Sequence, residues 1–440
     1  MHKFANPSSG NHGNGTELHV PEAPATDPVQ GVVFTYAKIN GIDLSNTADW
    51  SKLGKLQITS EGQVSLVGDD TVSSGQAADF QETNVKGEAV VNDLGIGAYV
   101  IVEKSAPSNV TKKSAPFVVT LPYPNANQSW LYHVHVYPKN TVLTSEEMPK
   151  KKLNNADKVH FAGDTIKWTI TQKIPQLDVN ETLAKFEITD NLPAGVNDIT
   201  NDSVQVTAPG GAQPNIQVIG GKNAKVSFEG AELAKLTSGT TVTVTISAVI
   251  ADNISGELSN QAQTNINDVT FNSDDPDNPS DDPNAPNATK VTFAKLTINK
   301  VNQQNKKLAD AKFVIWPKPA DGQCGNKPET AKEMVTAGEL GTVEKQVKVG
   351  EYCVQETEAP AGYVISEEYK APKNISVTAG GKTLTITNLK IGETGTFGLP
   401  NLPLTGATGA LVLTALGAVI LAVGANFVIL AMRRRRAEER

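Results

Sequence analysis

The chain is poor in aromatic residues and in cysteine, and these shortages exclude several kinds of protein. Aromatic residues make up 5% of its 440 residues, and Cys324 and Cys353 are its two cysteines. Two cysteines cannot form a zinc site of four thiolates. The net charge is −8 and the strongest basic run is 433–436, so we expect no nucleic-acid partner.

Motifs of enzyme active sites are also missing. The sequence has no GxSxG, no phosphate-binding loop and no nucleophile–histidine pair in a recognisable setting. We therefore predict a protein that is not an enzyme and that uses no cofactor and no metal.

What the chain does contain is strand-like alternation. The segment TIKWTITQ places Ile166, Trp168 and Ile170 on one face, and TTVTVTISAVI does the same with Val242 and Val244. Before residue 407, almost no segment shows a sustained period of 3.6 residues. The 36 glycines and 25 prolines supply turns between short strands. We predict an all-β chain of three tandem immunoglobulin-like β-sandwich domains, followed by a C-terminal transmembrane helix.

That helix is predicted from the long apolar run 407–432, which is long enough to cross a hydrocarbon core of about 30 Å. The basic tail 433–440 follows, and the positive-inside rule places it in the cytoplasm. No apolar leader follows Met1, although the tail implies export. We therefore expect the start of the chain to be truncated or trimmed.

The residues just before this helix distinguish a permanent anchor from a sorting signal. LPLTG resembles the LPxTG motif of Gram-positive surface proteins and comprises Leu402, Pro403, Leu404, Thr405 and Gly406. The resemblance implies that a sortase cleaves between Thr405 and Gly406 and joins the Thr405 carboxyl group to an amine.

Composition shifts divide the chain further. The Asp/Pro/Asn-rich stretch 273–289 is interpreted as a linker, with a calcium-binding loop as the less favoured alternative. The predicted layout is an N-terminal domain 1–140, a middle domain 141–272, the linker 273–289, a third domain 290–392, a stalk with the sorting motif 393–406, the helix 407–432 and the tail 433–440.

The two cysteines fall in the third domain. In an exported protein we expect Cys324 and Cys353 to form a disulfide, which in the chain-entropy model stabilises the fold by roughly 3–4 kcal/mol. Two unpaired buried thiols remain the alternative.

Three polar residues occupy inward positions of strands in the third domain. Glu356 is in phase with Tyr352 and Val354, while Lys300 and Asn388 lie in phase with the apolar residues of KLTINKV and TLTITNL. Burying these groups is costly unless they contact one another. The alternation therefore predicts that Lys300, Glu356 and Asn388 meet in the core.

The segment from Tyr352 to Tyr363 resembles the E-box, YxxxETxAPxGY, of Cna B-type domains in Gram-positive adhesins and pilins. The resemblance implies an isopeptide bond between Lys300 and Asn388, with Glu356 as the catalytic acid. Burial favours a neutral lysine, which is the nucleophilic form. A buried Lys–Glu ion pair with a hydrogen-bonded asparagine is the alternative.

The middle domain carries a similar set with an aspartate. Asp190 and Asn260 are in phase with apolar neighbours, and the surrounding pattern resembles pilin D2 domains, which implies a lysine–asparagine bond assisted by Asp190. Lys150, Lys151 and Lys152 are adjacent candidates for the lysine. We choose Lys151, because it shares its parity with Leu153.

The N-terminal domain offers a weaker version. In GAYVIVEKSAP, Glu103 is in phase with Tyr99 and Ile101, and Lys3 and Asn140 could complete a third set. The motif is degenerate, so we favour a solvent-exposed Glu103 at a strand end over a third isopeptide site.

The segment WLYHVHVYPKN, residues 130–140, resembles the pilin motif WxxxVxVYPK. Alternation predicts a strand with Trp130 and Tyr132 inward and Lys139 accessible. The resemblance implies that Lys139 attacks the sortase-bound Thr405 of the next subunit. His133 and His135 would lie outward, and we interpret them as surface histidines rather than metal ligands.

Together these resemblances indicate an LPxTG-anchored major pilin, the shaft subunit of a covalent surface pilus that supports adhesion. The expected partners are pilus-specific and housekeeping sortases, identical subunits joined head-to-tail, tip and base pilins, and peptidoglycan, with host surface receptors as further candidates. The expected location is the cell wall of a Gram-positive bacterium. The alternative is a monomeric wall-anchored adhesin built from Cna B modules.

Overall fold

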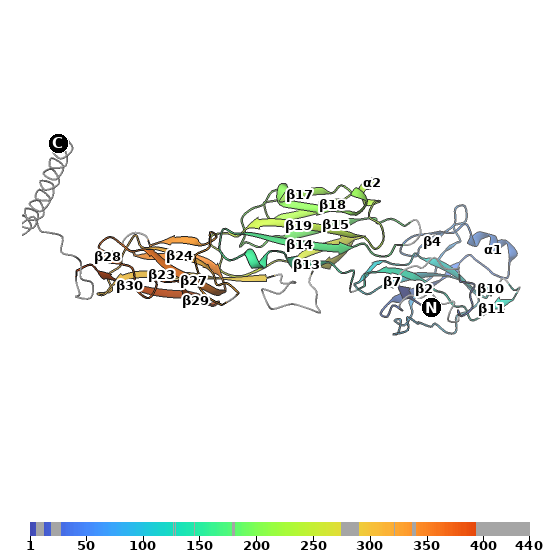
Figure 1. Cartoon of the computed structure of the whole chain (residues 1–440). Coiled ribbons are helices and arrows are strands. Elements are labelled where there is room, and N and C mark those ends of the chain that lie inside the picture. Colours follow the sequence, from blue (N-terminus) through green and yellow to red (C-terminus); the bar gives the residue numbers. More distant parts are fainter. Residues whose placement is uncertain are drawn as a thin grey trace, which may run out of the picture. The chain divides into compact units, whose positions relative to one another are not determined.

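The computed structural model describes residues 1–5, 13–18, 28–125, 127, 129–144, 146–177, 181–273, 290–320, 322–336 and 340–392. It is built almost wholly from β-strands, coloured along the sequence in Figure 1. The chain divides into two compact units. The first holds residues 1–297, 344–351 and 376–382, and the second holds the remainder.

The predicted linker from residue 274, the sorting motif and the predicted helix 407–432 lie outside the described residues. Within the described ranges, no helix is long and apolar enough to span a membrane. The helices of this part are short: α1 (Thr47–Leu53), α2 (Gly230–Leu233) and the 3-10 turns η1 (Ala156–Lys158), η2 (Asn201–Ser203) and η3 (Pro209–Gly211).

The first part of unit 1 contains two main sheets, of order β5-β2-β7-β9 and β1-β12-β8. Strand β1 pairs with β12 in parallel, with Phe4 opposite Lys139 and Ala5 opposite Asn140. The strands are β1 (Phe4–Ala5), β2 (Val33–Asn40), β3 (Gln57–Ile58), β4 (Val64–Ser65), β5 (Ser73–Ser74), β6 (Ala78–Asp79), β7 (Gly97–Ser105), β8 (Val110–Lys112), β9 (Phe117–Leu121), β10 (Tyr123–Pro124), β11 (Trp130–Leu131) and β12 (Lys139–Val142).

The middle of the chain forms a β-sandwich whose sheets have the orders β13-β14-β19-β16 and β17-β18-β15-β21-β22. Its strands are β13 (Lys150–Leu153), β14 (Thr165–Lys173), β15 (Phe186–Asn191), β16 (Val204–Thr207), β17 (Asn215–Ile219), β18 (Asn223–Phe228), β19 (Thr241–Val249), β21 (Ala262–Ile266) and β22 (Val269–Asn272). Strand β20 (Gly256–Ser259) pairs instead with β23 (Lys290–Asn302).

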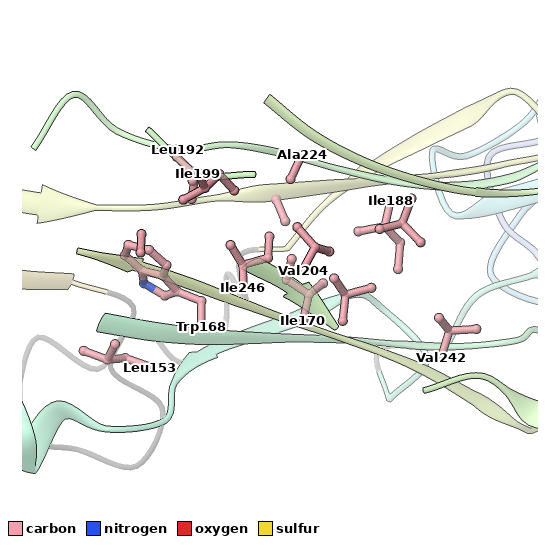
Figure 2. Close-up of a cluster of buried hydrophobic side chains, with 14 of the residues drawn as sticks. Leu153, Trp168, Ile170, Ile188, Leu192, Ile199, Val204, Ala224, Val242 and Ile246 are labelled. Carbon is pink, nitrogen blue, oxygen red and sulfur yellow. The ribbon is translucent and has the colours of Figure 1, made fainter. Parts of the chain in front are cut away.

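Alternation explains the core of this sandwich. Ile166, Trp168 and Ile170 of β14 are all fully buried, as the sequence predicts, and so are Val242 and Val244 of β19. Figure 2 shows side chains from the two layers pointing into the space between them. This packed interior surrounds the polar groups described below.

In unit 2 two sheets again face each other. One contains β23, β30 and β28 in that order, with β26 beside β23, and the other has the order β25-β24-β27-β29. The strands, some of which extend into unit 1, are β23 (Lys290–Asn302), β24 (Lys312–Pro317), β25 (Lys332–Val335), β26 (Thr342–Lys348), β27 (Gly350–Glu358), β28 (Tyr363–Val364), β29 (Lys373–Val377) and β30 (Lys382–Lys390).

One predicted strand is wrong. Residues 132–138 are not in a strand, and Trp130 and Tyr132 are 54% and 70% exposed rather than inward. The reason is that this segment lies beside the first residues of the chain and bonds to them: the His2 N–H donates to the Val136 carbonyl at 2.8 Å. Regular strand begins only at Lys139, after Pro138, which has no N–H to donate.

Candidate functional site

The described chain contains three buried sets of a lysine, an acid and an asparagine. In the first, Lys3 precedes β1, Asn140 lies in the neighbouring strand β12, and Glu103 comes from β7 in the other sheet. The Lys3 Nζ lies 2.8 Å from Glu103 Oε2, and Asn140 Nδ2 donates to Glu103 Oε1 at 2.6 Å. Exposed fractions are 0% for Lys3, 6% for Glu103 and 1% for Asn140.

This arrangement corrects the sequence-based preference for a solvent-exposed Glu103. The glutamate is buried because parallel pairing of β1 with β12 brings Lys3 and Asn140 over it. Burial lowers the pKa of Lys3 from 10.5 to about 8, and the nearby Glu103 only partly opposes that shift. The Phe34 ring, 5.4 Å from Lys3 Nζ, lines the same apolar surroundings.

The second set joins the two sheets of the middle sandwich. Lys151 of β13 places its Nζ 2.6 Å from Asp190 Oδ2 of β15, and both side chains are buried. Asn260 Nδ2 donates to the same oxygen at 3.5 Å. Asp190 pairs with Ala262 in the β15–β21 ladder, which places Asn260, two residues earlier, beside it. Burial raises the pKa of Asp190 despite the lysine.

The structure also separates the three adjacent lysine candidates of the middle domain. Lys151 is 5% exposed, whereas Lys150 and Lys152 point outward and are exposed. The Trp168 ring lies 5.4 Å from Lys151 Nζ. Only Lys151 among the three therefore contacts Asp190, as its parity with Leu153 predicts.

The third set lies within unit 2. Lys300 of β23 donates to the Oδ1 of Asn388, in the adjacent strand β30, at 2.5 Å and to the Ile386 carbonyl at 2.9 Å. Asn388 Nδ2 donates to Glu356 Oε1, on the opposite sheet, at 2.6 Å. The Glu356 oxygen lies 3.7 Å from Lys300 Nζ. All three residues are at most 1% exposed, and burial lowers the pKa of Lys300 to about 8.

Two hydrogen-bond donors of these sites had not been predicted from the sequence. Ser114 contacts both Glu103 and Asn140, and Ser366 N–H donates to Glu356 Oε2 at 3.0 Å. Both serines donate their backbone N–H from segments without strand alternation, so side-chain patterns carry no signal for these contacts. Their effect is to fix the carboxylates that face the lysines.

Each set can support amide formation between its lysine and its asparagine. The lowered pKa of Lys3 and of Lys300 brings each amine closer to its neutral, nucleophilic form at physiological pH. A carboxyl group that contacts both the amine and the amide nitrogen can transfer a proton between them. The alternative chemistry, a static ion pair, would use the same contacts but leave the asparagine unchanged.

Lys139 lies on β12 beside Asn140 and is half-buried. Next to it, residues including Phe117, Tyr123 and Pro138 line a hollow in the surface. Its expected partner in the polymer, Thr405, is outside the described residues.

Of the two histidines near Lys139, His133 is exposed, as predicted, whereas His135 is half-buried. A 2.8 Å hydrogen bond joins His135 Nδ1 and His2 Nε2. Among the described residues, no group of three or more His, Cys, Asp or Glu side chains is arranged to hold a metal.

Cys324 and Cys353 form the predicted disulfide. Cys353 is buried on β27, where it packs with Val314 and Trp316. It has the opposite parity to Glu356 on the same strand, so the disulfide and the lysine–asparagine pair lie on opposite faces of that sheet.

Comparisons with known proteins cover the whole chain. Four family descriptions match successive parts: "Gram-positive pilin subunit D1, N-terminal domain" at 2–141, "Cell surface antigen I/II C2 terminal domain" at 144–280, "Prealbumin-like fold domain" at 294–390 and "LPXTG cell wall anchor motif" at 398–439. The match at 144–280 thus carries another name than the pilin D2 type expected from the sequence, whereas the prealbumin-like match covers the part expected to be of Cna B type.

Individual proteins agree with these matches. The chain is 30% identical to the fimbrial subunit type 2 of Actinomyces naeslundii, across 100% of this chain and 90% of that protein. Its fold is similar to that of the full-length major pilin SpaD of Corynebacterium diphtheriae, with a TM-score of 0.68, 23% identity and coverage of 89% and 96%. The major pilin SpaA of the same organism gives a TM-score of 0.54 at 22% identity, covering 88% and 99%.

Tandem β-sandwiches that end in a sorting signal define a cell-wall-anchored surface protein of a Gram-positive bacterium. The chain belongs to the family of LPXTG-anchored major pilins and fimbrial subunits. It is a structural subunit of a sortase-assembled pilus and not an enzyme.

Proposed function

We propose that a sortase polymerises this subunit through an amide between the Thr405 carbonyl carbon and Lys139 Nζ. The sortase thiolate attacks that carbonyl, the Thr405–Gly406 bond breaks, and the residues from Gly406 onward leave as an amine. The Lys139 amine then attacks the thioester of a second subunit and the thiol departs. Because donor and acceptor differ, the contact is heterologous and extends into a fibre.

Each subunit is further closed by internal amides, Lys3–Asn140, Lys151–Asn260 and Lys300–Asn388. In each, the lysine nitrogen bonds to the asparagine Cγ and the amide nitrogen leaves as ammonia. Glu103, Asp190 and Glu356 accept the proton of the amine and deliver one to the leaving nitrogen. The reaction happens once in each site and consumes no cofactor.

The observation that carries this proposal is the recurrence of one buried constellation at three places in the chain. Buried ion pairs are seldom more stabilising than apolar packing, so three such sets need another explanation than stability. Conversion of amine and carboxamide into a neutral amide removes the buried charge. The structure of SpaA is described as pointing to a modular pilus assembly with stabilising isopeptide bonds, which supports the same chemistry here.

The proposed layout assigns one cross-link to each of three domains, 1–140, 141–272 and 290–392, with immunoglobulin-like topology. The apolar run 407–432 holds the chain in the membrane until sortase cleavage. Pilus-specific and housekeeping sortases act in turn, so that peptidoglycan attachment is the last event. Tip and base pilins and host receptors are further partners in this scheme.

Polymerisation is tested with wall extracts boiled in SDS. We expect a ladder of high-mass species in the parent strain and its collapse to monomer with Lys139→Ala. Lys152→Ala, which removes an exposed lysine of the middle sandwich, is the matched control and keeps the ladder. A ladder that survives Lys139→Ala refutes the assigned nucleophile, and a parent strain with monomer alone favours the monomeric adhesin.

A further inference from the structure

Ser114 occupies a special position in the N-terminal site. Its backbone N–H donates both to Asn140 Oδ1 at 2.9 Å and to Glu103 Oε2 at 3.0 Å. Its hydroxyl donates to the same Glu103 oxygen at 2.7 Å. No family motif quoted above includes this residue, which lies between β8 and β9.

Amide formation at Asn140 places negative charge on a known atom. When the Lys3 amine adds to Cγ, the carbonyl oxygen Oδ1 becomes the oxyanion of a tetrahedral intermediate. The Ser114 N–H is a donor within 2.9 Å of that oxygen before the reaction begins. A fixed donor at this place needs no rearrangement as the charge develops.

We propose that the Ser114 N–H is the oxyanion donor for closure of the Lys3–Asn140 amide, and that its hydroxyl positions Glu103. This inference rests on the isopeptide chemistry proposed above. As Lys3 adds, its proton passes to Glu103 and the C–O double bond becomes a C–O single bond. As the intermediate collapses, the double bond re-forms and Nδ2 leaves with that proton as ammonia.

The two oxygens of Glu103 already face the two ends of this proton transfer. Oε2 lies 2.8 Å from the Lys3 amine, and Oε1 accepts from the leaving nitrogen of Asn140 at 2.6 Å. Both Ser114 groups contact Oε2, the oxygen on the amine side. The serine therefore holds the carboxylate so that Oε2 faces the amine that gives up a proton and Oε1 faces the nitrogen that receives one.

The other two sites lack an equivalent donor among the described residues. Asn388 Oδ1 accepts from the nucleophile Lys300 itself, which loses this contact as its nitrogen becomes bonded to Cγ. Asn260 Oδ1 is buried without a hydrogen-bond partner in the described part of the chain. The Lys3–Asn140 site is thus the one with a backbone donor to the reacting carbonyl.

The test compares chains that differ in one atom of the backbone. Ser114→Ala removes the hydroxyl and keeps the N–H, and lactic acid at position 114 replaces that N–H with an ester oxygen. Full chains are made by cell-free translation, and the peptides carrying the Lys3–Asn140 and Lys300–Asn388 amides are quantified over time by mass spectrometry. The rate at which the Lys300–Asn388 amide forms in the same chain is the internal reference.

Removal of an oxyanion donor costs about 100-fold or more in rate, so we expect that slowing at Lys3–Asn140 in the lactic acid chain relative to Ser114→Ala. The Lys300–Asn388 amide should form at the same rate in both. Equal rates at Lys3–Asn140, or equal slowing at both sites, overturns the role of Ser114. Absence of the Lys3–Asn140 amide from the unaltered chain refutes instead the proposed cross-link itself.

Discussion

Lys139 and Asn140 are consecutive residues of β12, and their side chains lie in opposite surroundings. Asn140 is 1% exposed and bonded to Glu103, while Lys139 is half-buried on the other side of the strand. The strand is held in parallel register by β1, the strand that follows Lys3. A Lys3–Asn140 amide therefore fixes the backbone immediately beside the amine that joins subunits.

This proximity predicts that the internal amide promotes polymerisation. Asn140→Ala removes the amide carbon but keeps the Lys3–Glu103 ion pair, so the charge of Lys3 stays compensated. We expect shorter SDS-resistant ladders, because β12 is then held by noncovalent contacts alone. Asn388→Ala, the equivalent change in unit 2, should leave ladder length unchanged. Equal ladders from both variants would contradict the coupling.

The intact mass of the folded ectodomain counts the cross-links. Each amide removes one ammonia, about 17 Da, and the disulfide removes about 2 Da. In Lys151→Arg the deficit relative to the mass calculated from the sequence should shrink by one ammonia, since a guanidinium cannot act as the nucleophile. Lys150→Arg and Lys152→Arg are the matched controls, because both lysines are exposed. A mass deficit unchanged in Lys151→Arg would show that another lysine reacts.

The closing reaction should speed up with pH and then level off. Burial lowers the pKa of Lys300 to about 8, so below that pH most of the amine is protonated and cannot attack the asparagine. The neutral fraction of the amine, and with it the rate of closure, rises about tenfold per pH unit below pH 8. Above pH 8 the amine is already neutral, so the rate becomes constant.

This pH profile is measured on chain recovered from inclusion bodies and refolded by dilution between pH 6 and 9.5. The appearance of the Lys300–Asn388 peptide gives the rate at each pH. A rate that rises to about pH 8 and then stays constant agrees with the lowered pKa of Lys300. A rate that keeps rising to pH 9.5 would instead indicate an amine with an ordinary pKa.

The disulfide and the Lys300–Asn388 amide should overlap in their effect on stability. The cysteines are 29 residues apart and lie inside the segment that the amide closes. In an Asn388→Ala background, replacing both cysteines with alanine should lower the free energy of unfolding by about 3–4 kcal/mol. With the amide intact the unfolded chain is already restrained, so the loss measured in urea should be smaller. Equal losses in both backgrounds would argue against the amide.

Alternation was enough to find most of the side chains of the three buried lysine–acid–asparagine sets. Lys300, Glu356, Asp190 and Lys151 are each in phase with apolar neighbours on regular strands, and each proves to be buried. Successive side chains of a strand point to opposite faces of the sheet. A polar residue two positions from an apolar one therefore points to the same face as that apolar residue.

The same reasoning failed where partners come from irregular or distant segments. Glu103 is in phase with Tyr99 and Ile101, but its burial depends on Lys3, 100 residues earlier. Lys3 lies just before β1, a strand of two residues. Trp130 and Tyr132 fit the alternating pattern in the sequence, yet strand β11 ends at Leu131, before Tyr132. Tertiary pairing decided both cases.

The position of Lys139 has a mechanical consequence. In a fibre of Thr405–Lys139 amides, tension enters each subunit at residue 139 and leaves at residue 405, so residues 1–138 lie outside the covalent line. The amides at Lys151–Asn260 and Lys300–Asn388 shorten that line to residues 139–151, 260–300 and 388–405. The N-terminal part would thus carry no tension, and its unfolding would not lengthen the covalent path along the fibre.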